Sequence, residues 1–335
     1  MRKTSLRTVL LLAFTVVAAA GAGALTIKLG SLVPKGSPWE VALRRLAAEW
    51  VRISDGSVTM QMYPSGAAGD EADMIRKMRI GQIQAALITV SGVQKIWNGV
   101  KALSYPLFIR DDAEFRRVME GFWPLLDREL EARGFKAVFW SPGGWVYFFT
   151  RLPVVRPDDL RRQKVWVWGD PVEIVAWQTM GFQVVPLSAL DIMTSLTGGM
   201  IDGMMTSPLL AASNQWFGIA SNMAGLKLSP LWGALVIPLR TWEAIPARLR
   251  PRLLEAAAPI ATELAPEITK ADEAAVAVMR KYGLRVTEMP VDARAEWEEV
   301  VSRGLPLLEG TAYDRAALEA VRKIIAEYRA SAAGR

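Results

Sequence analysis

Two side chains that enzymes often use for acid–base and nucleophilic catalysis are missing from this chain. Its 335 residues include no histidine and no cysteine. This excludes Ser-His-Asp and Cys-His nucleophile systems, the usual zinc ligands and any disulfide. No GxGxxG motif opens a helix and no GxxxxGK[ST] motif occurs, which leaves no phosphate-binding signature. We therefore expect a binding protein rather than an enzyme, with no cofactor and no metal ion.

The residues best suited to hold a ligand lie in the segment 157–207. This segment reads PDDLRRQKVWVWGDP, continues as GFQVVPLSALDIMTSLTGGMIDG and ends in MMTS, a pattern typical of strand, helix, strand and helix. Trp166 and Trp168 share one face of the first strand, because side chains alternate along a strand. Asp170 precedes a proline, where it either caps the following helix or contacts a ligand from the end of the strand.

The first 24 residues have the pattern of a secretion signal rather than of a folded element. A basic head is followed by an almost unbroken apolar run over residues 9–20 and then by the small residues Ala22, Gly23 and Ala24. The alternative is an uncleaved membrane anchor, but a spanning helix needs ~20 apolar residues and this run is shorter. No second stretch approaches that length. We expect a secreted mature chain that is not itself embedded in the membrane.

The charge of the chain gives no support to a nucleic-acid partner. The formal net charge is +6, and residues 1–24 contribute three basic and no acidic residues to it, so their removal leaves +3. The remaining basic side chains alternate with acidic ones, as in RRLAAEW and EADMIRKMR. Such mixing is typical of solvated helix faces, and we expect no nucleic-acid binding.

The chain after residue 24 alternates between short apolar strands and amphipathic helices. The strand-like runs are bounded by loops rich in glycine or proline, and the helices show apolar positions at a helical spacing. This alternation predicts a parallel sheet covered by helices. The first elements expected are strands at LTIKLGSLV, VTMQMYP and QAALITV and helices at residues 39–53 and 71–80.

Three later features indicate two lobes joined by crossing segments. Gly143 and Gly144 separate two aromatic-rich strands, so we place the first crossing there. The second crossing falls near residues 229–232, where a return strand begins. Residues 246–282 form a nearly continuous helical pattern, which at 1.5 Å per residue would extend to roughly 50 Å. Such a helix is longer than one small lobe, and we expect it to span both.

Four segments carry motifs that occur together in one known family. They are IKLGSLVPKGSPW, VTMQMYPSGAAGDEADMIRKMRIGQIQAALI, ALSYPLFIRDDAEF, and PDDLRRQKVWV with LTGGMIDG. Each motif alone is weak, but the four follow the family's order and cover most of residues 25–235. Together they resemble the DctP-type solute-binding proteins of tripartite ATP-independent periplasmic (TRAP) transporters.

The resemblance implies an α/β protein with the two-lobed periplasmic binding protein fold. Each lobe would be a sheet covered by helices, and crossing strands and one long helix spanning both lobes would join them. Residues 1–24 would be the signal peptide, residues 25–143 with about 232–271 lobe I, and residues 144–231 with about 272–330 lobe II. The ligand would bind between the lobes, and closure of the lobes would bury it.

The family also implies a function and partners. The protein would be an extracytoplasmic solute receptor that captures a small organic solute in the interlobe cleft. It would deliver this solute to the two-part integral-membrane permease of a TRAP-type secondary transporter, without ATP. A binding protein of another transporter class and a chemosensory receptor partner share the same architecture and stay as alternatives. An enzyme in such a fold would have to use carboxylate or lysine chemistry.

Three positions that carry polar ligand-binding residues in the family carry other side chains here. The main arginine of the family, which binds a substrate carboxylate, is replaced by Trp166. The arginine of a G-F-R strand is replaced by Val146, and a common asparagine by Thr206. A hydrogen bond to a charged group contributes ~1.5–3 kcal/mol, so losing two arginine contacts would leave a small dicarboxylate poorly held. We expect instead an organic acid with an apolar or aromatic portion.

Aromatic and sulfur-containing side chains occupy the strands that the resemblance places at the cleft, although such residues on strands often belong to a core. Two tryptophans of lobe I would form the opposite wall, and serines would supply hydroxyl groups. Arg151 and Lys164 are the nearest candidates for a substitute cation. The expected ligand contacts are Trp39, Ser91, Trp97, Trp145, Val146, Tyr147, Trp166, Trp168, Asp170, Met205, Thr206 and Ser207.

Overall fold

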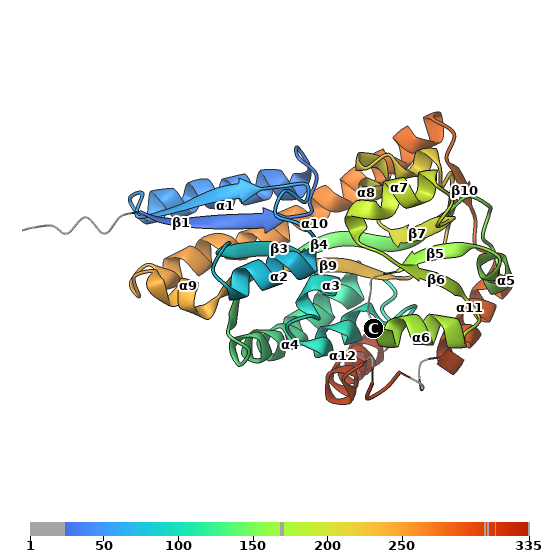
Figure 1. Cartoon of the computed structure of the whole chain (residues 1–335). Helices are drawn as coiled ribbons and strands as arrows, with labels where there is room; N and C mark the ends of the chain where they lie inside the picture. The colour runs from blue at the N-terminus through green and yellow to red at the C-terminus, as the bar shows by residue number, and fades with distance from the viewer. Residues whose placement is uncertain (1–23, 168–170, 305, 307, 312, 334–335) are drawn as a thin grey trace, which may run out of the picture.

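The computed structural model describes residues 24–167, 171–304, 306, 308–311 and 313–333, and it contains the two expected α/β lobes (Figure 1). Nearly all of the expected signal peptide lies outside these residues. The strands are β1 (Leu25–Ser31), β2 (Val58–Tyr63), β3 (Ala85–Thr89), β4 (Phe135–Thr150), β5 (Lys164–Val167), β6 (Gln183–Pro186), β7 (Gly203–Thr206), β8 (Asn222–Ala224), β9 (Ser229–Pro238) and β10 (Arg285–Thr287). Their main order is β2-β1-β3-β9-β4-β7-β5-β6. Strands β4 and β9 connect the two lobes.

Lobe I is built on β2, β1, β3, β9 and the first half of β4. Its helices are α1 (Pro38–Ile53), α2 (Glu71–Arg79), α3 (Val90–Val93), the 3-10 helix η1 (Asn98–Ser104), α4 (Asp112–Glu131), α9 (Leu239–Ala244) and the first part of α10 (Arg250–Lys281). Strand β1 pairs in parallel with β2 and β3. Leu87 of β3 packs in a cluster with α1 and α10, whereas its neighbour Ile88 packs with α2 and α4. Both faces of the sheet are therefore covered, as the apolar strands predict.

Lobe II is built on the second half of β4 together with β7, β5 and β6. Its helices are α5 (Pro157–Arg161), α6 (Pro171–Thr179), η2 (Ala189–Asp191), α7 (Ile192–Thr197), α8 (Pro208–Ser213), η3 (Trp216–Gly218) and α11 (Val291–Gly304). Strand β5 lies between β7 and β6 and runs parallel to both. Trp166 of β5 enters one buried cluster, and its neighbours Val165 and Val167 enter another on the opposite face. Both faces of this sheet are also covered.

Strand β4 is one continuous strand of 16 residues, where the sequence suggested two strands separated by a glycine pair. It pairs with β9 in both lobes, and the register of this pairing shifts between Pro142 and Trp145. Gly144 lies within the shift and has φ +83°, a conformation that favours glycine. The glycine pair therefore forms a bulge inside a crossing strand instead of a break between two strands.

The long helix expected over residues 246–282 is α10, which has 32 residues and includes Pro259 and Pro266. At 1.5 Å per residue it is roughly 48 Å long. It packs on α1 in lobe I and on α8 in lobe II. Figure 1 shows this orange helix passing behind the strands from one lobe to the other. The prediction of two lobes with a shared helix is therefore confirmed.

The C-terminal helix α12 (Arg315–Ala333) packs on lobe I, against α4 and η1. Arg329 of α12 donates to both carboxylate oxygens of Glu114 and to the carbonyl oxygen of Phe108. The expected division grouped residues from about 272 to 330 with lobe II, and this grouping does not hold for α12. The other boundaries of that division stay predictions.

Candidate functional site

A cavity of about 400 Å³ lies between the two lobes. Its lobe I wall includes residues 32–35 after β1, Thr89 at the end of β3 and residues 141–143 of β4. Its lobe II wall includes the ends of β5 and β7. Ligands of open α/β sheets bind outside the carboxyl ends of the strands, and pockets for small molecules measure ~300–1,000 Å³. The position and the volume of this larger cavity suit a small organic ligand.

Four indole rings line the larger cavity, those of Trp39, Trp166, Trp216 and Trp232. Trp39 Nε1 donates to the carbonyl oxygen of Pro142 at 2.8 Å. Trp166 Nε1 donates to the carbonyl oxygen of Leu187 at 3.0 Å. Trp232 Nε1 is buried and has no hydrogen-bond partner among the described residues. Two of these N–H groups are therefore engaged by the protein itself, and the indoles present mostly apolar ring surface to the cavity.

A smaller cavity of about 130 Å³ adjoins the larger one. Trp166, Met205 and Leu231 line both cavities and so form the wall between them. Trp166 stands where the resemblance would place an arginine, and no arginine occurs among the described residues that line either cavity. The polar side chains around the smaller cavity are those of Ser91, Gln94, Lys101, Ser104, Ser229 and Tyr313.

The end of β7 brings two of its three expected contacts to the cavities. Met205 lines both cavities, and Thr206 lines the larger one. Ser207 is fully buried and lines neither of them. Its Oγ accepts a hydrogen bond from the backbone N–H of Leu210 at 3.5 Å and caps the N-terminus of α8. Ser207 therefore stabilises the start of a helix, as serine commonly does.

The crossing strand β4 brings one of its three expected contacts to a cavity. Val146 lines the smaller cavity. Trp145 is buried; its Nε1 donates to Asp112 at 2.9 Å, and the Lys227 ammonium lies 4.9 Å from its ring centre. Tyr147 is half-buried, and burial together with nearby carboxylates raises the pKa of its hydroxyl to about 12. Alternation places Trp145 and Tyr147 on the other face of the strand from Val146, away from the cavities.

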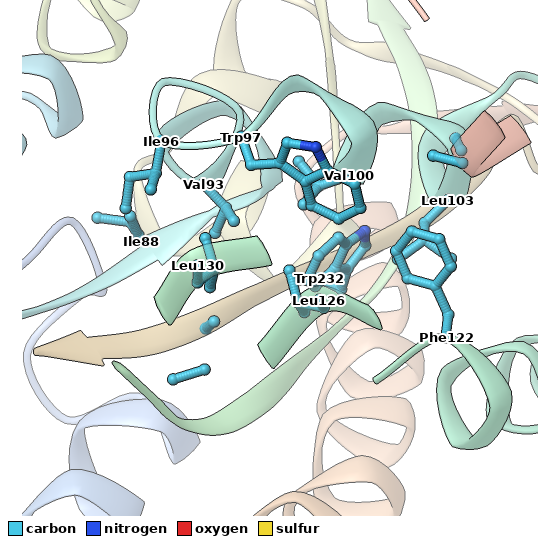
Figure 2. Close-up of a cluster of buried hydrophobic side chains, with 14 of the residues drawn as sticks. Ile88, Val93, Ile96, Trp97, Val100, Leu103, Phe122, Leu126, Leu130 and Trp232 are labelled. Atoms are coloured by element: carbon cyan, nitrogen blue, oxygen red, sulfur yellow. The ribbon is translucent and has the colours of Figure 1, made fainter. Parts of the chain in front are cut away.

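Lobe I contributes Trp39 and Ser91 to the cavities and keeps Trp97 in its core. Trp39 lines the larger cavity, and Ser91 lines the smaller one. Figure 2 shows Trp97 inside a cluster of buried side chains, and its ring stacks on that of Phe122 with centroids 5.8 Å apart. Trp97 lines neither cavity. Its packing stabilises lobe I instead of forming a wall of the site.

Two expected contacts cannot be placed, and both candidate cations lie away from the cavities. Trp168 and Asp170 lie outside the described residues. Arg151, a candidate substitute cation, lies 3.8 Å from the carboxylate of Asp202. Lys164 Nζ, the other candidate, donates to a backbone carbonyl oxygen beyond α7 at 2.8 Å. Both cations therefore stabilise lobe II, and the ligand-binding role of the residues that do line the cavities stays a prediction.

Sequence reasoning missed the cation that lines the smaller cavity. Lys101, in η1, is 5% exposed and also contacts other residues of the chain. Gln94 Nε2 and Ser104 Oγ line the same cavity and are buried without a hydrogen-bond partner among the described residues. A signal was present, since Lys101 is the single charged residue in the apolar run VKALSYPLFI. Lysine is almost never fully buried unless its charge is paired.

Glu71, at the start of α2, is a buried carboxyl group that lines the larger cavity. It accepts hydrogen bonds from the backbone N–H of Thr89 at 2.6 Å and from Thr89 Oγ1 at 2.9 Å. Burial raises the pKa of Glu71 to about 7 in spite of these bonds. Glu71 therefore connects α2 to the end of β3 and fixes Thr89 at the edge of the cavity.

The two lobes also contact each other directly beside the larger cavity. Ser188 Oγ of lobe II donates to Asp70 Oδ2 of lobe I. Asp70 uses Oδ1 to accept from the backbone N–H of Glu71 at the start of α2. Leu190 of lobe II lies against Gly66 of lobe I and leaves no room there for a side chain. The structure therefore represents an arrangement in which the lobes touch across the site.

Charged groups are few at the cavities. Among the described residues that line them, Lys35 and Glu71 lie at the larger cavity and Lys101 lies at the smaller one. The described part of the chain has no group of three or more acidic side chains placed to hold a metal ion. No helix within that part is long and apolar enough to cross a membrane.

Two α/β lobes that enclose a cavity at the ends of their strands define a two-lobed solute-binding protein. Residues 29–306 match the family described as bacterial extracellular solute-binding protein, family 7, or DctP. The match covers most of the chain, and the protein therefore belongs to this family. The resemblance to DctP-type receptors is thus confirmed. The family consists of substrate-binding proteins rather than enzymes.

Known proteins similar to this chain agree with the family. The C4-dicarboxylate-binding periplasmic protein DctP of Rhodobacter capsulatus is 22% identical over 286 residues, 83% of this chain and 84% of the relative. A TRAP periplasmic solute-binding protein from Shewanella oneidensis, solved with bound succinate, covers 90% of this chain and all of its own, with a TM-score of 0.84 and 16% identity. One from Desulfovibrio salexigens, solved with bound orotic acid, gives a TM-score of 0.83 at 18% identity over 90% of this chain and 99% of its own. These two likenesses show the fold.

Proposed function

We propose that this protein is an extracytoplasmic receptor for a small organic acid with an apolar or aromatic portion. It captures the acid in the larger interlobe cavity and delivers it to the two-part membrane permease of a TRAP-type transporter. The observation that carries this ligand class is the lining of the larger cavity, which has four indole rings and no arginine among its described residues. The proposed location is the periplasm, reached through the expected signal peptide of residues 1–24.

Proteins of the same fold support the acidic part of the ligand. The Shewanella oneidensis protein binds succinate, the Desulfovibrio salexigens protein binds orotic acid, and the Rhodobacter capsulatus relative is named for C4-dicarboxylates. All of these ligands carry at least one carboxylate. We infer that this chain also binds an acid and differs in the side chains that hold it.

The burial of indole surface supports the apolar part of the ligand. A buried aromatic side chain covers ~150–250 Å², and ~25 cal/mol per Å² of apolar area makes this several kcal/mol at most. A bidentate arginine–carboxylate pair gives orientation as well as energy. Trp166 at the arginine position therefore favours a ligand that gains from apolar contact. A small dicarboxylate has little apolar surface and gains least.

Thermal unfolding of the purified chain from Leu25 to Arg335 tests this ligand class. The melting temperature is measured with succinate, D-glucuronate, orotate, phenylacetate, 4-phenylbutanoate and 6-phenylhexanoate. A ligand at 100 times its Kd adds ~2.7 kcal/mol to the free energy of unfolding. We expect an upward shift with the phenylalkanoates. A shift with succinate alone, or with none of the compounds, contradicts the proposed ligand, and chemical turnover of a bound compound contradicts a receptor.

Delivery to a permease is tested separately, in proteoliposomes that contain the permease encoded with this receptor. Uptake of a labelled phenylalkanoate is expected to require both the receptor and an ion gradient, and to proceed without ATP. The matched control contains the permease and gradient without receptor. Uptake that is equal in the control, or that requires ATP hydrolysis, contradicts the proposed partner.

A further inference from the structure

The smaller cavity concentrates hydrogen-bond donors and a cationic side chain, and no acidic side chain occurs in its described lining. Lys101 lines it while being 5% exposed. Gln94 Nε2 and Ser104 Oγ are each buried without a partner among the described residues. An unsatisfied buried polar group costs ~1–3 kcal/mol, so natural proteins keep few of them. Two such groups beside a lysine in one cavity indicate a site for an anionic group.

Local structure fixes the backbone positions that carry these three side chains. Lys101 and Ser104 are three residues apart in η1, and side chains at this spacing lie above one another on a 3-10 helix. Gln94 follows directly after α3, whose first turn is capped by Thr89 Oγ1 accepting from Ser91 N at 3.2 Å. Both elements pack against β9. The backbone around the donors is therefore in place before a ligand arrives, which lowers the entropic cost of binding.

We propose that the smaller cavity is the subsite for the ligand's carboxylate, bound by Lys101, Gln94 and Ser104. The apolar body of the ligand then extends past Trp166 and Met205 into the larger cavity. This inference rests on the proposed function and adds to it the orientation of the ligand and the cation that replaces the family arginine. The smaller cavity of about 130 Å³ has room for a carboxylate, since a water molecule occupies ~30 Å³ in the liquid.

The larger cavity is less suited to a carboxylate. Glu71 lines it, and a second acidic group close to Glu71 would be disfavoured by like-charge repulsion. Lys35 also lines it but is exposed, and solvent screens an exposed charge. A ligand with one carboxylate at one end and an apolar body at the other fits this distribution. The proposed ligand class is therefore an elongated monocarboxylic acid.

Matched pairs of acid and amide test the carboxylate subsite. Dissociation constants are measured by calorimetry for phenylacetate, 4-phenylbutanoate and 6-phenylhexanoate and for their three primary amides. Each amide keeps the shape and the apolar body of its acid but lacks the charge. Because hydrogen bonds to charged groups contribute about 10- to 100-fold in affinity, we expect the best acid to bind at least about 10-fold more tightly than its amide.

Three lysine variants identify the cation. Lys101→Met keeps most of the length of the side chain without its charge, and Lys35→Met tests the lysine at the larger cavity. Lys95→Met is the matched control, because Lys95 is exposed and lines neither cavity. We expect Lys101→Met to reduce the affinity for the best acid by about 10- to 100-fold and to leave the affinity for its amide unchanged within a few-fold. Lys95→Met is expected to leave both affinities unchanged. A loss that follows Lys35 instead of Lys101 overturns the assignment.

Gln94→Leu keeps the test decisive if Lys101→Met fails to fold. Because Gln94 Nε2 has no partner in the described chain, its removal breaks no recorded hydrogen bond. We expect the unliganded variant to melt at the same temperature as the wild type or higher, and to bind the acid several-fold more weakly. A variant that loses stability and keeps the affinity would show that Gln94 is structural and would overturn its part in the subsite.

The outcomes separate this inference from the proposed function. Equal binding of acids and amides leaves an apolar-lined receptor intact and overturns the carboxylate subsite. Binding of succinate alone, or of no compound, overturns the proposed ligand and the subsite together. If the acids bind more tightly than their amides and Lys101→Met weakens the binding of the acid, the carboxylate subsite and the proposed function are both supported.

Discussion

Trp166 belongs to a core and to a cavity wall at the same time. Its side chain is 3% exposed, packs in the buried cluster of lobe II and donates to the carbonyl oxygen of Leu187. The same ring borders both cavities. The sequence presented core and cleft as alternatives for this residue, but a side chain at the end of a buried strand satisfies both. Its substitution is therefore expected to change stability and binding together.

Substitution of Trp166 separates the two contributions. Trp166→Ala is expected to lower the free energy of unfolding by ~3–5 kcal/mol, as for large core residues, and to merge the two cavities. Trp166→Phe keeps a ring between them but loses the N–H donor and part of the ring volume, at a cost of ~1–3 kcal/mol. Urea unfolding measures stability, and calorimetry with 4-phenylbutanoate measures affinity. If the alanine variant folds and binds as tightly as the wild type, Trp166 acts only in the core.

The raised pKa of Glu71 predicts how the stability of the protein depends on pH. Its pKa in the folded protein is about 7, above the ordinary value of 4.5, because burial disfavours the carboxylate. The folded state therefore binds this proton more tightly than the unfolded chain. The resulting stability is complete below about pH 4.5 and is lost as the pH rises through 7. Asp272 also makes stability fall as the pH rises, because burial raises the pKa of its carboxyl group to about 7 as well.

Glu71→Gln is expected to flatten part of this pH dependence. The measurement is the melting temperature of the wild type and the variant at pH 5, 6, 7 and 8. The wild type should lose stability over this range, and the variant should lose less, with the residual slope coming from Asp272. Parallel curves for the two proteins would show that Glu71 does not titrate in this range.

At single residues, the family resemblance rather than strand periodicity gave the expectations for the strands at the site. Val146, Trp166, Met205 and Thr206 all line cavities, and their contact with a ligand stays a prediction. Ser207, which the sequence offered as a hydroxyl donor, instead caps a helix, and a capping serine has the same local pattern as a binding one. The side chains of η1 and its neighbourhood were not predictable. Short 3-10 segments have no clear periodicity, and tertiary packing decides which of their side chains face a cavity.

At the scale of elements, residues 188–190 of lobe II contact the segment that leads into α2 of lobe I, beside the larger cavity. The hydrogen bond from Ser188 to Asp70 and the contact of Leu190 with Gly66 lie at this junction. Contacts of this kind exist only while the lobes touch. They therefore favour the closed arrangement without contacting a ligand, and the free energy of closure contributes to affinity.

Ser188→Ala tests this contribution. The variant removes a hydrogen bond of ~1 kcal/mol from the closed arrangement, so we expect the Kd for 4-phenylbutanoate to rise about 5-fold. Ser302→Ala is the control, because Ser302 Oγ donates within α11, to the carbonyl oxygen of Glu299. An equal change in both variants, or none in Ser188→Ala, would show that this contact does not stabilise closure.

The same scale explains which elements the sequence predicted. The strands and helices before residue 90 and the long helix α10 agree with expectation, because their apolar periodicity is strong. Strand β4 differs because a bulge lets two glycines continue a strand that they were expected to interrupt. The location of α12 was missed, since its amphipathic pattern requires an apolar partner but does not specify which lobe provides it.

At the scale of the whole molecule, one carboxylate links elements that connect the two lobes. Asp272 of α10 accepts from the backbone N–H of Leu209 at the start of α8, at 2.8 Å, and from the backbone N–H of Trp145 in β4. It thereby joins the shared helix to the crossing strand and to lobe II. Gly144, in the bulge of β4, leaves the space that this carboxylate occupies. The bulge at Gly144 and the carboxylate of Asp272 are therefore packed against each other.

Two glycine substitutions test whether the space at Gly144 and the position of the Asp272 carboxylate are coupled. Gly134 and Gly144 both have φ +83°, but a Cβ at Gly134 would meet no atom within 4 Å, whereas a Cβ at Gly144 would lie 2.1 Å from Asp272 Oδ2. Gly134→Ala should cost ~1–2 kcal/mol through its backbone conformation alone. Gly144→Ala should cost ~1–3 kcal/mol more, because it displaces a hydrogen-bonded carboxylate. Urea unfolding measures both, and equal costs would show that Asp272 moves aside freely.

The four indoles around the larger cavity also provide an intrinsic fluorescence signal for ligand binding. They are four of the 13 tryptophans in the chain, so a substantial part of the near-ultraviolet emission arises from rings that border the cavity. The wavelength and yield of indole emission depend on the polarity around the ring and on contact with quenching groups. An occupant that displaces water from these rings should therefore shift the emission to the blue. Candidate solutes can be ranked in this way without any attached dye.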